Sequence, residues 1–466
     1  MIYKSITYNQ KLNIKLPDIR QFFRFTLPLM LFLCQSCLTL KLDDTPYQQT
    51  NYYQKTRQGI LNYAAPEYTL TRDTVQVGWA KVAITPARPV PMAGYGKRKG
   101  KKYTQVRDSV YVRAFVFKLG SRKVAWVTAD LLIMPMSVTA KLQQLLPARG
   151  YNLANTYLTA THTHYSIGGW GRKPAGRLMA GKYSPVMVKY IADAITQAIE
   201  RAEATAAPAR MAYQQINAPE YVYNRLVGEQ GGLDPFIRLL QIQKNSGERA
   251  LLVTYAAHAT SVSSQDLRLS AEYPGALVKA LEQRLALNMA AFGAGAVGSH
   301  GPRAPDQEYE KVQNLANGLA DRIQENIPKG VLAYQTQLQS AYYPLYLPNP
   351  QWRAGERRFR PWLFYTVFGK YPAGISALQI GPVVFLGTPC DFSGELLPEL
   401  TATAARQQQQ LIVNSFNGGY IGYVTPEKYF TLKKYETRDM NFFGRYTGTY
   451  LQEMMQLIIQ RRAVNR

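Results

Sequence analysis

Short apolar runs alternate with helical patterns along most of the chain after residue 75. Runs rich in β-branched and aromatic residues predict strands, and apolar positions recurring every three to four residues predict helices. This alternation predicts an α/β fold in which a mixed β-sheet core is flanked by helices. The expected strands cover 76–86, 113–118, 123–129, 156–161, 238–243 and 250–255, with a hairpin over 374–381 and 383–387; the expected helices cover 131–146, 185–202, 274–287 and 309–327.

The polarity of the chain divides it into three parts. Residues 1–37 have the pattern of an export signal, and residues 38–75 are polar, rich in Tyr and Gln, and expected to form a tether with a short helix near 50–63. Residues 76–466 contain no internal repeat and no clean linker. We therefore expect one catalytic domain over 76–466.

The leader has a basic segment before an apolar run over residues 25–33. That run is too short to span a bilayer, which takes about 20 residues. Ser36-Cys37 resembles a bacterial lipoprotein processing site, in which Cys37 would become the lipidated first residue. We expect an exported protein at the cell envelope, anchored through Cys37 or otherwise associated with the membrane; an uncleaved anchor segment is the alternative.

Charge and cysteine content narrow the partners and the metal chemistry. The chain has 55 basic against 30 acidic residues, a net charge of +25, which favours an anionic neighbour such as a membrane surface or nucleic acid. Of these, the anionic membrane surface is the expected partner, with no nucleic acid expected. Basic clusters at 97–102 and 353–360 fit lipid contact, although a solvated basic face is the plain alternative. Outside the leader the only cysteine is Cys390, so His, carboxylate or Tyr must hold any metal.

Two of the four histidines lie two positions apart, at His162 and His164, where a predicted strand ends. Because side chains alternate along a strand, both imidazoles are expected on one face. The pair indicates a metal or acid-base site, and a buried, hydrogen-bonded strand end is the alternative.

Polar side chains recur just past the predicted strands: Asp130, His162, His258 and Asp391 each follow an apolar run. Open α/β sheets bind their ligands at the carboxyl ends of the strands, so we expect these groups to share one crevice. Two imidazoles and a carboxylate are sufficient for a catalytic zinc ion. The long, irregular spacing leaves an ordinary His/Asp acid-base pair open.

Two other sequence patterns are weaker evidence for a function. Residues 293–298 match GxGxxG by letter but follow a helical pattern, so nucleotide binding is not expected. For His300 beside them, a structural or solvent-facing role is expected rather than ligation. Serines cluster after His258, yet no Gly-x-Ser-x-Gly elbow is near them, which disfavours a serine hydrolase.

Several ordered blocks together resemble the neutral/alkaline non-lysosomal ceramidase superfamily, over about residues 78–448. The blocks are Ala83-Ile-Thr-Pro86, Gly94-Tyr95, Val112-Arg-Ala-Phe115, Ala160-Thr-His-Thr-His164 with Gly168-Gly169, Asn224-Arg225, His258-Ala-Thr-Ser261, Ser270-Ala-Glu-Tyr-Pro-Gly275, Gly419-Tyr-Ile-Gly-Tyr-Val-Thr425 and Lys434-Tyr435-Glu436. The resemblance implies a zinc-dependent amide hydrolase that cleaves the N-acyl bond of ceramide or a related lipid.

The same resemblance implies roles for individual residues. Two imidazoles, a carboxylate and an unusual tyrosine would bind Zn²⁺, and three further residues would hold the amide and its oxyanion. The implied ligands are His162, His258, Asp391 and Tyr423; the implied catalytic residues are His164, Arg225 and Tyr435. Ser270 and Glu272 are the candidates for orienting the two ligand imidazoles.

The sequence departs from the family pattern at two points. Asp391 is one methylene shorter than the family's Glu, so Glu395 is a possible substitute ligand. The family's C-terminal immunoglobulin-like domain is expected to be absent. Both departures leave open a second hypothesis, an envelope-anchored protein that binds lipid or polyanion on a degenerate hydrolase scaffold.

Overall fold

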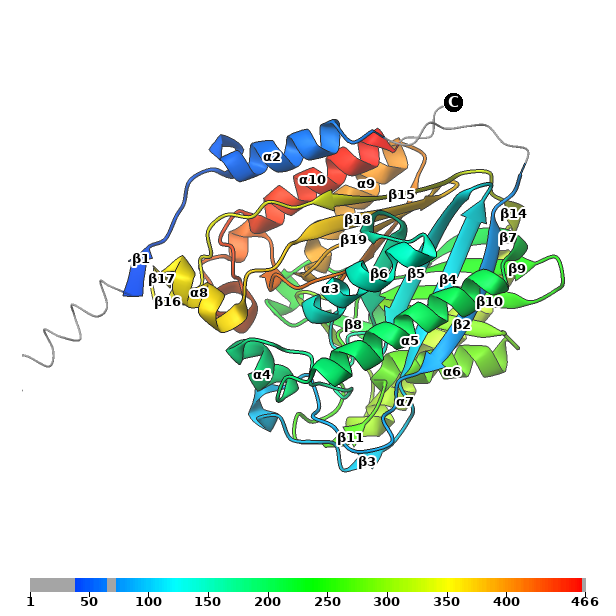
Figure 1. The fold of residues 1–466 in the computed structure, drawn as a ribbon, viewed down its shortest axis with the longest axis horizontal. Helices are drawn as coiled ribbons and strands as arrows, with labels where there is room; N and C mark the ends of the chain where they lie inside the picture. Colours follow the sequence, from blue (N-terminus) through cyan, green and yellow to red (C-terminus); the bar gives the residue numbers. More distant parts are fainter. Residues whose placement is uncertain (1–37, 65–72, 463–466) are drawn as a thin grey trace, which may run out of the picture.

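The computed structural model describes residues 38–64 and 73–462, and these residues form four layers (Figure 1). Two β-sheets pack face to face, and helices cover the outer face of each sheet. The expected mixed α/β fold is therefore confirmed, although the sequence did not predict that the core contains two sheets. The export signal predicted for residues 1–37, with Cys37, lies outside the described residues.

The larger sheet is mixed and has nine strands. Its main order is β12-β10-β9-β7-β2-β4-β5-β6, and β14 pairs with β7; β10–β12 and β5–β6 are the parallel pairs. The strands are β2 Gln76–Ala83, β4 Tyr111–Leu119, β5 Arg122–Ala129, β6 Thr156–Ala160, β7 Ala207–Asn217, β9 Phe236–Lys244, β10 Arg249–Tyr255, β12 Met289–Ala294 and β14 Ala333–Tyr334.

The smaller sheet has four strands in the order β15-β18-β19-β21, with the predicted hairpin at its centre. They are β15 Leu338–Pro344, β18 Gly374–Ile380, β19 Val383–Gly387 and β21 Gln410–Asn414. Short paired segments complete the topology: β1 Thr39–Lys41 with β17 Arg357–Phe359 and β16 Arg353–Ala354, β3 Gln105–Val106 with β11 Arg268–Leu269, β8 Val222–Asn224 with β13 His300–Pro302, and β20 Asp391–Phe392 with β22 Tyr423–Val424.

Two groups of helices form the outer layers. The larger sheet is covered by α3 Met136–Leu145, α5 Pro185–Ala204, α6 Glu272–Arg284 and α7 Glu308–Asn326. The smaller sheet is covered by α2 Asn51–Leu61, α9 Leu397–Arg406 and α10 Thr447–Arg461. Two short helices, α4 Pro174–Ala180 and α8 Pro361–Phe368, lie at one end of the molecule (Figure 1).

The layer between the sheets is filled by large aromatic and aliphatic side chains. Phe117, Trp126 and Tyr157 of the larger sheet belong to one buried cluster with Phe385 and Ile412 of the smaller sheet. Alternate residues of the same strands point into the helical layer, so the strands are buried on both faces. This double burial explains why they appear in the sequence as nearly continuous apolar runs.

The segment expected to be a tether is packed against the body over its described part. Tyr47, Tyr53 and Ile60 are buried in the cluster that α10 shares with the smaller sheet. Tyr47 Oη and Tyr53 Oη both donate to the Glu453 carboxylate, over 2.8 and 2.6 Å. The tether prediction is therefore wrong for this part, because three side chains of a mostly polar segment are buried against the body. The helix predicted near 50–63 is α2.

Two smaller points differ from or add to the sequence analysis. Residues 289–294 form β12 rather than a helix, so the GxGxxG stretch begins at the end of a strand. This stretch leads into the short strand β13 and not into a nucleotide-binding helix.

Within residues 38–64 and 73–462, no helix combines the length and apolar character needed to cross a membrane.

We predict that Ile60→Ala lowers the free energy of unfolding by about 2–4 kcal/mol, because it leaves a cavity at a fully buried position on α2. Val331→Ala, at a position 86% exposed, should change it by less than about 0.5 kcal/mol. Urea unfolding of the two variants measures the difference. Equal effects would contradict the packing of α2.

Candidate metal and active site

The candidate site is built from loops that leave the carboxyl ends of strands. His162 follows β6, His258 follows β10, and Asp391 follows β19 at the start of β20. Asp391 and Tyr423 are direct neighbours in the parallel β20–β22 pair, which sets the carboxylate beside the phenol. The structure therefore brings together all four residues that the resemblance implied as ligands.

The histidine pair reaches the site by a turn rather than by strand alternation. Strand β6 ends at Ala160, and His162 has a positive φ of 64°. This left-handed conformation is uncommon for residues other than glycine and costs backbone energy. The turn directs both His162 and His164 into one cavity, as expected, but for a different reason from the one predicted.

Each of the three imidazoles is oriented by a backbone carbonyl. Nδ1 of His162 lies 2.6 Å from the Leu132 oxygen, Nδ1 of His164 lies 3.0 Å from the Gly94 oxygen, and Nδ1 of His258 lies 3.3 Å from the Val297 oxygen. A carbonyl oxygen can only accept, so each Nδ1 carries the proton. In a neutral ring this leaves a lone pair on Nε2.

These three lone pairs converge. Nε2 of His162 lies 2.7 Å from Nε2 of His258 and 3.2 Å from Nε2 of His164. Two such nitrogens cannot hydrogen bond to each other, because neither carries a proton. A cation between them would remove the repulsion, and the three ring nitrogens are close enough together to hold a metal ion.

Asp391 adds an oxygen ligand to the same point. Its Oδ1 lies 3.7 Å from Nε2 of His162 and 3.8 Å from Nε2 of His258, and it receives no hydrogen bond from the described residues. Its other oxygen accepts a 2.7 Å hydrogen bond from Tyr420 Oη. Tyr423 Oη lies 3.5 Å from Nε2 of His258. The donor set therefore fits a divalent metal: convergent nitrogen lone pairs with an unsatisfied buried carboxylate oxygen.

Burial controls the charges of these groups. Desolvation lowers the pKa of His162 to about 3, and it also lowers the pKa of His164 and His258 well below the usual value. Desolvation raises the pKa of Asp391 to about 7. The three imidazoles are therefore neutral at physiological pH, whereas the carboxyl group must release a proton to bind a cation.

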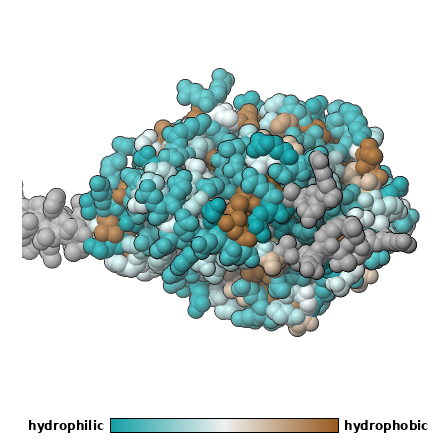
Figure 2. Space-filling view, turned by 90° about the horizontal axis from the view of Figure 1, so that it is seen from above, coloured by the Kyte–Doolittle hydropathy of each residue, from teal (hydrophilic) through white to brown (hydrophobic). Residues whose placement is uncertain are grey.

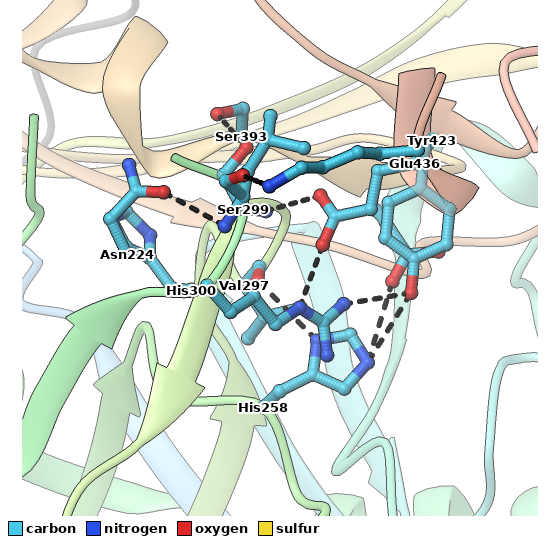
Figure 3. Close-up of polar contacts among 12 residues, drawn as sticks. Asn224, His258, Val297, Ser299, His300, Ser393, Tyr423 and Glu436 are labelled. Carbon is cyan, nitrogen blue, oxygen red and sulfur yellow. Dashed lines mark hydrogen bonds and ion pairs between the residues drawn. The ribbon is translucent and has the colours of Figure 1, made fainter. Parts of the chain in front are cut away.

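Arg225 forms the charged side of the site. Its Nε donates to Glu436 Oε1 over 2.7 Å, and its Nη2 donates to Tyr423 Oη over 3.0 Å. Glu436 also accepts a 2.8 Å hydrogen bond from the Ser299 backbone N–H, and Figure 3 shows the two residues side by side. Burial opposes the charge on Arg225, but its pKa is raised by Tyr423 and Glu436, so it stays positive.

Three other predicted residues lie elsewhere. Asp130 forms a buried ion pair with Arg113 at 3.0 Å and does not line the cavity. Glu395 accepts hydrogen bonds from Asn224 and Tyr429, so it does not replace Asp391 as a ligand candidate. His300 is buried against backbone oxygens, as its predicted structural role requires.

The expected orienting residues are also different. Ser270 and Glu272 do not contact His162 or His258, whose Nδ1 atoms meet backbone carbonyls instead. Glu272 accepts hydrogen bonds from the backbone N–H groups of Ser261 and Tyr273, which fixes the loop behind His258. That prediction was wrong because sequence blocks carry no information about backbone partners.

Sequence reasoning missed three residues that shape the site. The Phe416 ring stacks on His162 at 3.8 Å between centroids, Tyr420 holds Asp391, and Glu436 holds Arg225. Tyr420 and Glu436 stand within the quoted family blocks, which was the available signal. No pattern in the sequence pointed to Phe416.

A cavity of about 1240 Å³ opens over the polar groups. Its floor contains the three histidines of the cluster, Arg225 and Asp391, while Tyr435, half exposed, stands with its ring 5.7 Å from that of Tyr423. Apolar side chains form much of its wall, among them Leu132, Met136, Trp170, Phe364 and Phe368. The cavity can therefore take an elongated apolar molecule with one polar group at the floor.

Comparison with known families supports the resemblance found in the sequence. Residues 75–303 match the family described as neutral/alkaline non-lysosomal ceramidase, N-terminal. The chain is 28% identical over 215 residues to a neutral ceramidase of Pseudomonas aeruginosa, and 26% identical over 203 residues to one of Mycobacterium tuberculosis. These matches cover 42% and 40% of this chain, and 32% of the length of each relative.

The fold is shared with solved structures as well. The crystal structure of neutral ceramidase from Pseudomonas aeruginosa superposes with a TM-score of 0.72 at 21% identity, covering 84% of this chain and 75% of that one. A structure described as a ceramidase complexed with C2 gives the same TM-score at 20% identity, with the same coverage. At this identity the likeness establishes the fold.

We predict that metal affinity falls as the pH is lowered from 7 to 5. The pKa of Asp391 is raised to about 7 in the metal-free protein, so below that pH a cation must displace a proton from it, at a cost of about tenfold in affinity per pH unit. Protons do not compete with the cation for the histidine nitrogens in this pH range, because the pKa values of the three histidines are lowered. Zinc titrations by calorimetry across this range measure the slope.

Asp391→Asn should weaken binding and reduce that slope by about one proton, since the titrating carboxyl is removed. Asp193→Asn, an exposed carboxylate on α5, should leave both unchanged. An Asp391→Asn variant with the wild-type slope would rule out Asp391 as the titrating ligand.

Proposed function

We propose that the protein is a zinc-dependent amide hydrolase, on the premise that residues 75–303 match the family described as neutral/alkaline non-lysosomal ceramidase, N-terminal. The substrate proposed is ceramide or a related N-acyl lipid, whose N-acyl bond is cleaved by an activated water. The observation that carries the proposal is the convergence of three imidazole lone pairs and one unsatisfied carboxylate oxygen at the floor of a large, mainly apolar cavity.

His162, His258, Asp391 and Tyr423 would hold the ion in this proposal. The Asp391 Oδ1 lies 3.7 Å from Nε2 of His162 and 3.8 Å from Nε2 of His258, and the Tyr423 Oη lies 3.5 Å from Nε2 of His258. The Nε2 of His164, by contrast, contacts Nε2 of His162. When bound, zinc supplies Lewis acidity, which polarises an amide carbonyl and makes a water acidic near neutral pH. Zinc is favoured over harder ions because two of the four proposed ligands are imidazole nitrogens.

The remaining side chains of the site provide binding and proton transfer. Arg225 is fixed by Glu436 and stays charged, so its guanidinium can stabilise negative charge that develops on the amide oxygen. Burial raises the pKa of Tyr435 to about 12, so its phenol keeps its proton and can donate a hydrogen bond to the same oxygen. His164 can accept a proton at Nε2 and pass it to the leaving amine, because its Nδ1 is fixed on Gly94.

The size and lining of the cavity support a lipid substrate. A volume of about 1240 Å³ is larger than a small polar amide needs, and aromatic side chains of α8 form part of its wall. Purified protein loaded with zinc is expected to hydrolyse a fluorescent N-acyl sphingoid base and to lose this activity with a chelator. No turnover by a fully zinc-loaded sample would favour the alternative, a lipid- or polyanion-binding protein on a degenerate scaffold.

We predict different losses for the two neighbouring histidines. His162→Ala should lose bound zinc, because it removes a ligand, whereas His164→Ala should keep about one zinc per chain and lose turnover by about 10²–10⁴-fold. Metal analysis and kinetics on the same preparations separate the two effects. Loss of zinc from His164→Ala would assign it to the metal instead.

We also predict that Arg225→Ala lowers kcat by about 10²–10³-fold while zinc is retained, because the donor to the developing negative charge is lost. Arg406→Ala, on the exposed side of α9, is the matched control and should keep wild-type kinetics. A change in KM alone for Arg225→Ala would contradict a role in stabilising the transition state.

A further inference from the structure

Exposed positive charges surround the opening of the cavity. The cavity-lining side chains that are both charged and exposed are Lys97, Arg172, Lys173, Lys370 and Lys434. The two carboxylates that line the cavity, Asp391 and Glu436, are buried at its floor. The mouth therefore presents to its surroundings a ring of cations without an exposed carboxylate among the lining residues.

Two apolar side chains stand beside this ring. The helices α4 and α8 contact each other, and both contribute residues to the cavity. Leu178 on α4 is 53% exposed, and Trp362 on α8 is 54% exposed. Single exposed apolar residues are common on proteins. A tryptophan and a leucine among lysines and arginines at the mouth of an apolar cavity are, however, the composition of a surface that meets a lipid interface.

The described chain also begins at this end of the molecule. Strand β1 pairs antiparallel with β17, and the Arg360 backbone N–H donates to the Leu38 oxygen over 2.9 Å, directly before α8. Figure 1 shows β1, β17, α8 and α4 at one end, far from β14. The view from above shows a largely hydrophilic surface with small apolar spots, one of them at that same end and others at the centre and the opposite end (Figure 2). The first described residues thus lie at the end that carries the cavity mouth.

We infer that the surface formed by α4, α8 and the cationic ring, here called the rim, docks the cavity mouth onto an anionic lipid bilayer. A bilayer fits all three features, because anionic headgroups pair with the cations, the interface accepts Trp362 and Leu178, and an apolar cavity that opens there is continuous with the lipid phase. An acidic soluble partner would account for the charge alone. The inference rests on the proposed function only in that a lipid substrate would enter through the rim.

The test is co-sedimentation of the full chain with vesicles of phosphatidylcholine mixed with phosphatidylglycerol, compared with phosphatidylcholine alone. Each basic residue near an anionic surface strengthens binding by about fivefold, so the double variant Arg172→Glu and Lys173→Glu should reduce partitioning by more than about tenfold. Raising the salt concentration should weaken wild-type binding, since the headgroup attraction is screened.

The matched control carries the same change of net charge at the opposite end. Arg210→Glu with Lys329→Glu alters exposed residues on β7 and beside β14, and should change partitioning by less than about threefold. Trp362→Ala and Leu178→Ser should each weaken binding, whereas Val331→Ser, the more exposed apolar position, should not. Tryptophan emission should shift to shorter wavelength on vesicles in wild type and not in Trp362→Ala.

Three outcomes would overturn the inference: equal losses from the rim and the control pairs, equal binding to both kinds of vesicle, or sedimentation that needs no lipid and marks association between copies of the chain. Vesicle binding requires no turnover. Failure of amide hydrolysis with intact rim binding would therefore reject the proposed function alone, and active enzyme without rim-dependent binding would reject this inference alone.

Discussion

The structure depends on one electrostatic constraint at its centre, the meeting of three imidazole lone pairs. Backbone carbonyls of Leu132, Gly94 and Val297 fix the proton of each ring on Nδ1, and no rotation that keeps those contacts can turn a proton toward the centre. Backbone positions are set by the surrounding fold and not by the site itself. The loops after β6 and β10 thus hold the acceptor nitrogens around one point, and the well-packed layers around them keep these loops in place.

Charged groups around the three imidazoles help to set the protonation of the rings. Arg225 lowers the pKa of the buried histidines, in addition to desolvation, which keeps the nitrogens free of protons. Glu436 pairs with Arg225 and is itself fixed by the Ser299 backbone N–H. The Arg225 guanidinium is therefore held in place at the cavity floor by Glu436 and Tyr423. Preorganised charge of this kind is what amide hydrolysis requires where the carbonyl oxygen becomes negative.

How much of the fold and the site could be predicted from the sequence depends on the distance along the chain over which each sequence pattern acts. Strands β4 and β5 and helices α5 and α7 were predicted nearly to their ends, because their periodicity is local. The face-to-face pairing of two sheets was not predicted, since a strand buried on both faces shows no alternation and cannot report what covers it. The candidate ligands His162, His258 and Asp391 could be named because each follows a predicted strand. Asp130 follows the same rule but lies in an ion pair with Arg113, so position at a strand end is not sufficient.

Asp391 shows how the fold accommodates a shorter acid where the family pattern has a glutamate. The β20–β22 pairing brings its backbone directly beside that of Tyr423, and the Tyr420 hydroxyl occupies one carboxylate oxygen, which turns the other toward the histidines. A longer side chain would have more rotamers and would need more restraint, whereas aspartate at this position is aimed by one hydrogen bond. The shorter acid still reaches the histidine cluster, because the parallel β20–β22 pair places its Oδ1 3.7 Å from Nε2 of His162.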